Sequence, residues 1–175
     1  MISGSTPIRD ALLAAGGNLK SGHTGPGIRP FYRTQIDPDK QPAPGPIDGD
    51  GRRSVYLEAR RLFPSEFLAV FDAPKPNILT GRRTETNVPG QSLALLNDPF
   101  VYHQAKLFAQ RITAFPNLTD EQRIQRMYEI AFARPPSNAE LERVVAFVRG
   151  AGSTDNSWSD LAHALFQMKE FIYLR

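Results

Sequence analysis

The second half of the sequence contains four stretches in which apolar residues recur every three or four positions, namely residues 99–114, 120–133, 138–149 and 158–174. This spacing places the apolar side chains along one face of an α-helix. Such helices become stable when several of them bury their apolar faces against one another. The pattern therefore predicts a mainly α fold, a helical bundle-like domain.

Three of these stretches follow a residue that suits the N-cap of a helix. Thr119 and Ser137 are each followed, three residues later, by a glutamine or a glutamate, which is the spacing of a capping box. Asp98 precedes Pro99, and proline is favoured at the first position of a helix. The sequence therefore predicts Asp98, Thr119 and Ser137 as structural caps. Residues 119–149 should form an antiparallel helical hairpin because their connection is short.

The first third of the sequence has a different character. Thr6 and Pro7 suit the start of a short helix, which a pair of glycines ends. The segment that follows, residues 16–51, holds six of the chain's 15 prolines and almost no apolar periodicity. This composition predicts an extended segment that is laid over the domain or is partly mobile. We therefore divide the chain into residues 1–51, a short helix plus a Pro/Gly-rich segment, and residues 52–175, the mainly helical domain.

A minor β element is predicted at residues 52–63. Val55 and Leu57 begin an alternation of apolar and polar side chains, which is the period of a strand. The one plausible partner strand is residues 77–83. Between the two strands, the sequence predicts a short helix that is capped by Ser65.

The residue types limit the chemistry that this chain can perform. The chain has no cysteine, which excludes disulfides, thiolate zinc sites and covalent haem attachment. Asp48 and Asp50 match the first and third positions of a calcium-binding loop. The sixth and twelfth positions, which require glycine and glutamate, are Arg53 and Ala59. The histidines have no metal-ligand spacing, and no catalytic motif occurs. We therefore expect no catalytic residue, no metal site and no cofactor in this chain.

Arginines indicate one candidate ligand-binding surface. Six residues make up this candidate set, namely Arg52, Arg53, Arg82, Arg83, Glu85 and Asn87. Guanidinium groups that converge can bind phosphate, sulfate or a nucleic-acid backbone. In the alternative, the arginines pair with nearby carboxylates, and residues 82–87 are only the polar part of a joint between two helices. The net charge of +3 is too small to favour nucleic acid by itself.

The sequence carries no signal for a membrane. No run approaches the roughly 18–20 apolar residues of a membrane span. The N-terminus has neither the basic region nor the apolar core of a signal peptide. We expect no membrane span in this chain, and its localisation stays open.

Long ordered motifs carry a resemblance to a known family. The chain contains "DGDGRRSVYLEARR", "GRRTETNVPGQSLALLNDPF" and "WSDLAHALFQMKEFIYLR" in that order. In these motifs it resembles the C-terminal part of the planctomycete domain of unknown function family 1553, commonly found with planctomycete cytochrome-c-like domains. The resemblance runs from about residue 7 to the end, with departures at Gly90 and Gln167. It supplies no established activity and no catalytic residues.

The resemblance implies that this chain is the C-terminal portion of a larger protein, and that full-length relatives are exported or lie in the cell envelope. Any haem would then belong to another domain. Our main hypothesis is a non-catalytic or accessory interaction module that docks on upstream domains of a larger chain or on another protein. One alternative is a fragment of an enzyme acting on carbohydrate, with catalytic residues upstream. Another is an anion or nucleic-acid binder that uses the arginine cluster.

Overall fold

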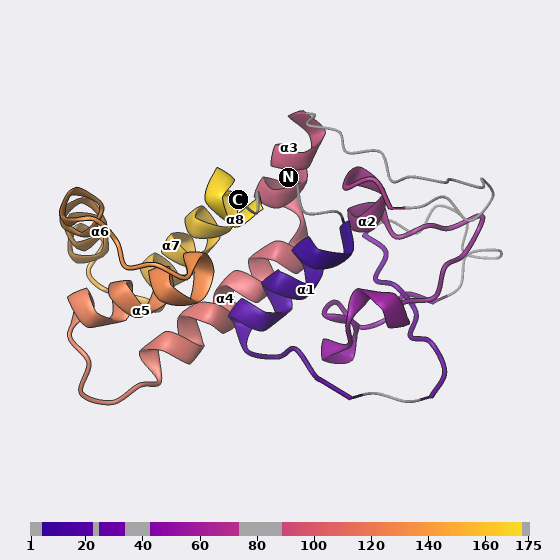
Figure 1. The fold of residues 1–175 in the computed structure, drawn as a ribbon, viewed down its shortest axis with the longest axis horizontal. Helices are drawn as coiled ribbons and strands as arrows, with labels where there is room; N and C mark the ends of the chain where they lie inside the picture. The colour runs from indigo at the N-terminus through magenta and orange to yellow at the C-terminus, as the bar shows by residue number, and fades with distance from the viewer. Residues whose placement is uncertain (1–4, 23–24, 34–42, 74–88, 173–175) are drawn as a thin grey trace.

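The structure is a computed structural model that describes residues 5–22, 25–33, 43–73 and 89–172. It is mainly helical, so the predicted fold class is confirmed (Figure 1). The α-helices are α1 (Ser5–Gly16), α2 (Glu66–Val70), α3 (Pro89–Asn97), α4 (Pro99–Thr113), α5 (Asp120–Phe132), α6 (Asn138–Gly150), α7 (Asp155–Gln167) and α8 (Lys169–Ile172). Two 3₁₀ turns, η1 (Gly49–Gly51) and η2 (Ser54–Tyr56), lie between α1 and α2.

Helix α4 is the centre of the hydrophobic core. It packs most extensively against α7 and α1, and Figure 1 shows α1 lying alongside it. Phe108 of α4 and Phe166 of α7 are fully buried and stack with their ring centroids 5.7 Å apart. Leu12 and Leu13 of α1 are fully buried in the same core. Helices α5 and α6 lie at one end of the molecule, and the irregular segments with α2 lie at the other (Figure 1).

Helices α4, α5 and α6 each begin directly after the capping residue that the sequence predicts. The Asp98 carboxylate accepts the Phe100 N–H at the start of α4. Thr119 and Ser137 each form a complete capping box at the starts of α5 and α6. The sequence suggests Thr6 as the N-cap and Pro7 as the first helical residue, but α1 starts two residues earlier, at Ser5, so Thr6 lies within the helix.

The last predicted helix, residues 158–174, differs from the structure. The chain enters α7 at Asp155, behind the side chain of Thr154, and leaves it at Gln167. Met168 is extended, with φ −67° and ψ 138°, and α8 follows. The break brings Phe171 against Phe166, with ring centroids 5.0 Å apart. Apolar spacing alone could not predict this break, because it depends on contacts with other parts of the fold.

The predicted strand at residues 52–63 is wrong. Residues 54–56 form the turn η2, and Leu57 makes only an isolated parallel bridge with Ile28. Within the described ranges there is no longer ladder, and the predicted partner at 77–83 lies outside them. Val55, which the strand pattern would bury, is 69% exposed. The alternation fails because hydrogen bonds from α1 to this segment, and not an apolar face, decide its conformation.

Where the structure describes it, the Pro/Gly-rich segment is held by hydrogen bonds within the segment and to Phe63. The Lys20 N–H donates to the Gly51 carbonyl at 2.8 Å, and the Gly45 N–H donates to the Pro30 carbonyl at 2.9 Å. Tyr32 is a buried residue, and its hydroxyl donates to the Phe63 carbonyl at 2.9 Å. Backbone hydrogen bonds therefore hold this segment, which has few apolar side chains to bury.

Candidate functional site

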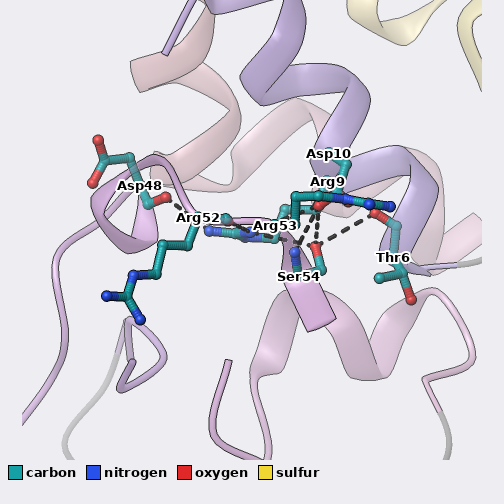
Figure 2. Close-up of polar contacts among 7 residues, drawn as sticks. All are labelled: Thr6, Arg9, Asp10, Asp48, Arg52, Arg53 and Ser54. Carbon is teal, nitrogen blue, oxygen red and sulfur yellow. Dashed lines mark hydrogen bonds and ion pairs between the residues drawn. The ribbon is translucent and has the colours of Figure 1, made fainter. Parts of the chain in front are cut away.

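Arg9 of α1 is the most buried charged side chain in the described part of the molecule, with 4% exposure. Its guanidinium donates to the carbonyl of Arg52 at 2.8 Å and to the carbonyl of Asp48 at 2.7 Å (Figure 2). A third, longer bond of 3.3 Å reaches the Ser54 hydroxyl. Burial lowers the pKa of Arg9 to about 10, although the charge of Asp10 opposes this effect. Arg9 therefore stays charged at neutral pH and fixes the loop 48–54 against α1.

Asp10, the next residue of α1, binds the same loop beside Arg9. Its carboxylate accepts the Ser54 N–H at 2.7 Å, the Ser54 hydroxyl at 2.8 Å and the Arg53 Nε–H at 3.1 Å (Figure 2). A serine nucleophile needs both a general base and access to a substrate. Ser54 is only 6% exposed, and its hydroxyl already donates to Asp10. This arrangement suits a structural role and not nucleophilic catalysis. We call Arg9 and Asp10, with their hydrogen bonds to residues 48–54, the Arg9 clasp.

The glycines of the Asp-Gly-Asp-Gly run allow the loop to approach α1. Gly49 has φ +62°, and a Cβ at this position would collide with the Arg9 guanidinium. The two carboxylate oxygens of Asp48 accept the Asp50 N–H at 2.9 Å and the Asn18 amide at 3.2 Å. Among the described residues no group of acidic, histidine or cysteine side chains is arranged to hold a metal ion. The run is thus the glycine-rich turn around Arg9.

The candidate arginines are only partly within the described residues. Arg82, Arg83, Glu85 and Asn87 lie outside them, so the candidate set as a whole stays a prediction. The other two members, Arg52 and Arg53, point in different directions (Figure 2). The Arg52 guanidinium donates to the Pro26 carbonyl at 2.7 Å, and Arg53 pairs with Asp10. Both guanidinium groups are therefore engaged within the chain.

A small cavity lies next to the Arg9 clasp, between the irregular segments and the helical body. Its volume is about 30 Å³, which is room for roughly one or two water molecules. Small-molecule sites usually enclose about 300–1,000 Å³. The lining combines charged side chains with phenyl rings and includes Arg9, Arg33, Glu66, Asp98, Phe31, Phe67 and Phe100.

Asp98 connects this cavity to the start of α4. Burial raises the pKa of its carboxyl, while the hydrogen bond from the Phe100 N–H and the charge of Arg33 act in the opposite direction. The sequence predicts Asp98 only as a cap, because its position in the cavity depends on segments distant in sequence. It also misses Arg9 and Asp10. A signal did exist for Arg9, which stands four residues before Leu13 and directly after Ile8, on the apolar side of α1.

Taken together, these features define a mainly helical domain whose irregular N-terminal segment is fastened to the core by a buried arginine. The family model described as "Protein of unknown function (DUF1553)" matches residues 4–148. The match covers most of the chain, so the chain belongs to this family. It spans the Arg9 clasp and the cavity and ends within α6. Neither the curated proteins nor the solved structures gave a match.

The length and the composition of the helices show whether any of them could span a membrane. Among the helices of the described ranges, none is both long and apolar enough to cross a bilayer.

Proposed function

We propose that this chain is a non-catalytic interaction module, the C-terminal portion of a larger envelope protein. The observation that carries the proposal is the outer face of α3. Leu93 and Leu96 stand one turn apart on this helix and are 59% and 49% exposed. Exposed large apolar residues that cluster on one face commonly mark protein interaction sites.

Helix α3 is held firmly enough to present that face. Its Leu95 is fully buried in the core, and its Gln91 amide donates to the Val70 carbonyl at 3.3 Å. On the α7 side, His163 Nε2 lies 2.9 Å from the Leu95 carbonyl oxygen, and its ring packs edge-on against Tyr102. Figure 1 shows α3 standing at the rim of the molecule. A preorganised face loses less conformational entropy on binding, which favours docking.

The proposed partner is an upstream domain of a larger chain, or another protein. The engagement of Arg52 and Arg53 within the chain and the small net charge of +3 argue against a nucleic-acid partner. The lack of cysteine supports a module that carries no covalently bound haem itself. An exported or envelope location is proposed for full-length relatives, following the family resemblance.

The test compares two pairs of apolar residues. In the test variant Leu93 and Leu96 are replaced by Gln, and in the control variant Val55 and Leu62, which are 69% and 83% exposed, are replaced by Gln. Calorimetry measures binding of each chain to the separately expressed region encoded upstream of Met1. We expect both variants to fold, the test variant to bind at least about tenfold more weakly, and the control to bind like the wild type. Equal affinities for all three chains would contradict the proposal.

One observation favours a second candidate function, a fragment of an enzyme that acts on carbohydrate. The carboxylates of Glu66 and Asp98 line the same cavity, and most glycosidases use a pair of carboxylates. The cavity is too small for a sugar ring, so upstream residues would have to complete it. If this candidate is correct, a chain extended upstream should release sugars from a polysaccharide panel, and Asp98→Asn or Glu66→Gln should abolish the release. Absence of release from the panel would leave the interaction module as the better explanation.

A further inference from the structure

The junction between α7 and α8 is a helix break without a helix-breaking residue. Residues 155–172 contain neither glycine nor proline, and their apolar side chains fit one continuous helix. Sharp interruptions in helices usually occur at such residues. Here the chain leaves the helix at Met168, which has ψ 138°. Tertiary contacts must therefore maintain the break.

The break interrupts the regular hydrogen-bond ladder. The Met168 N–H donates to the Leu165 carbonyl at 3.1 Å, three residues back, and the Phe171 N–H donates to the Met168 carbonyl at 2.9 Å. A continuous helix would restore the bonds to carbonyls four residues back. Local backbone energetics thus favour the straight form, and the broken form depends on contacts made by α8.

One of these contacts joins Glu170 to Arg134. The Arg134 guanidinium donates two hydrogen bonds to the Glu170 carboxylate, at 2.8 and 2.7 Å. Arg134 is positioned independently of α8, because it also donates two bonds of 3.0 Å to Glu140 and lies over the rings of Tyr128 and Phe132. Paired bonds of this kind are geometrically specific. The position of Arg134 therefore does not depend on α8, and its hydrogen bonds to Glu170 hold α8 in place.

We propose that α8 is a switchable segment. With the Arg134–Glu170 pair in place, α8 folds back against α5 and α7, and without this pair residues 155–172 form one continuous helix. Straightening would withdraw Phe171 from Phe166, which is fully buried in the broken form. It would open an apolar surface where α8 now packs against α7. This inference goes beyond the docking face on α3 and does not depend on it.

The functional groups of Arg134 and Glu170 indicate which kind of ligand could separate them and so straighten the helix. The Arg134 side chain is 35% exposed and the Glu170 side chain 30%, so solvent and partners reach both groups. A phosphate or carboxylate group on a partner can compete for the guanidinium, because it offers the same paired acceptors as Glu170. An anionic partner is therefore the expected trigger.

The experiment reads the backbone at Met168 by its ¹³Cα chemical shift in the full chain. In the wild type and in the control Glu142→Gln, which alters an exposed carboxylate on α6, the shift should be of the extended type. In Glu170→Gln and in Arg134→Met it should move to the helical type. An extended or random-coil shift in Glu170→Gln would overturn the proposal, because packing of Phe171 and Ile172 would then set the break.

A titration of the wild type with inorganic phosphate, at constant ionic strength, tests the trigger. The Met168 shift should move in the same direction as in Glu170→Gln, and sodium chloride at equal ionic strength should leave it unchanged. A Met168 shift that does not respond to phosphate would overturn the anionic trigger.

Discussion

At the scale of single residues, Arg9 illustrates how one buried charge can order a segment that has few apolar side chains. Its guanidinium uses backbone carbonyls of Arg52 and Asp48 as acceptors, so the loop conformation and the charge stabilise each other. A buried charge is tolerated only when hydrogen bonds and nearby charges compensate for lost hydration. Here Asp10 supplies the compensating charge, with its Oδ1 4.0 Å from the guanidinium.

The first prediction concerns Arg9→Met. This change leaves the carbonyls of Asp48 and Arg52 without these donors and removes the buried one of the two cations beside Asp10, so we expect a loss of about 3 kcal/mol in the free energy of unfolding. Arg60→Met is the matched control. Arg60 pairs with Glu58 at 2.8 Å on the surface, and its removal should cost less than about 1 kcal/mol. Urea denaturation measures both, and equal losses would show that Arg9 has no special structural role.

Gln104 of α4 is the second residue with an unusual environment. It is fully buried, and neither its amide nitrogen nor its carbonyl oxygen has a hydrogen-bond partner among the described residues. An unsatisfied buried polar group typically costs about 1–3 kcal/mol. Gln104→Met keeps nearly the same volume and removes the polar atoms, so it should stabilise the fold by about 1 kcal/mol.

Thermal denaturation measures this effect, with Gln110→Met as the control because Gln110 is exposed on the same helix. The control should change the stability little. A clear destabilisation by Gln104→Met would mean that a buried water molecule satisfies the amide in solution.

At the scale of elements, the sequence predicts local structure well and tertiary adjustments poorly. The capping patterns place the starts of α4, α5 and α6 correctly because caps bond to the backbone within three residues. The break at Met168 and the turn at residues 54–56 are missed. At both places the structure shows side-chain hydrogen bonds, from Arg134 and Asp10, to residues more than 30 positions away.

The α5–α6 hairpin gives a prediction of pH dependence. Hydrogen bonds from Arg134, together with the Ser137 N–H, lower the pKa of Glu140 from its usual value of 4.5 to about 2. Because the folded-state pKa is depressed, the stabilisation is complete above pH 4.5 and is lost as the pH falls toward 2. Glu140→Gln keeps an oxygen for the Ser137 N–H but removes the charge. The variant should therefore be less stable than the wild type at pH 7, by about 1 kcal/mol for a partly exposed pair.

Thermal denaturation at pH 7 and pH 2 tests this prediction. The difference between the two proteins should shrink at pH 2, where Glu140 of the wild type is becoming protonated. Glu142→Gln, on the exposed side of α6, should have little effect at either pH. A difference that is the same at both pH values would assign the loss to packing and not to charge.

At the scale of the whole molecule, the helical half follows from the sequence and the irregular half does not. Apolar periodicity identifies which faces of α4, α5 and α6 are buried, and this is enough to predict a helical body. The position of residues 43–58 depends on Arg9, Asp10 and the glycines of η1, whose partners no periodicity indicates. For the same reason the cavity beside Asp98 could not be predicted, since its lining comes from six separate segments of the chain.

Residues 16–51, the irregular segment, should be an integral part of this fold. Its composition suggests amides that exchange freely until an upstream partner covers them, since ordering each residue costs roughly 1–2 kcal/mol. In the structure, however, the amides of Lys20, Ile28 and Ser54 each donate to an acceptor within the chain. We expect these three amides to be protected from hydrogen exchange in the isolated chain.

Arg9→Met should then remove the protection of Lys20, Ile28 and Ser54 together, by about 100-fold or more, because about 3 kcal/mol corresponds to roughly two powers of ten. Amides of α4 and α7 should remain far better protected than these three in the same variant, since their bonds lie within helices packed on each other. If instead the three amides exchange rapidly in the wild type, the segment needs an upstream partner to order it. The docking surface would then extend from α3 to residues 16–51, and Arg9 would be part of the interface with that partner.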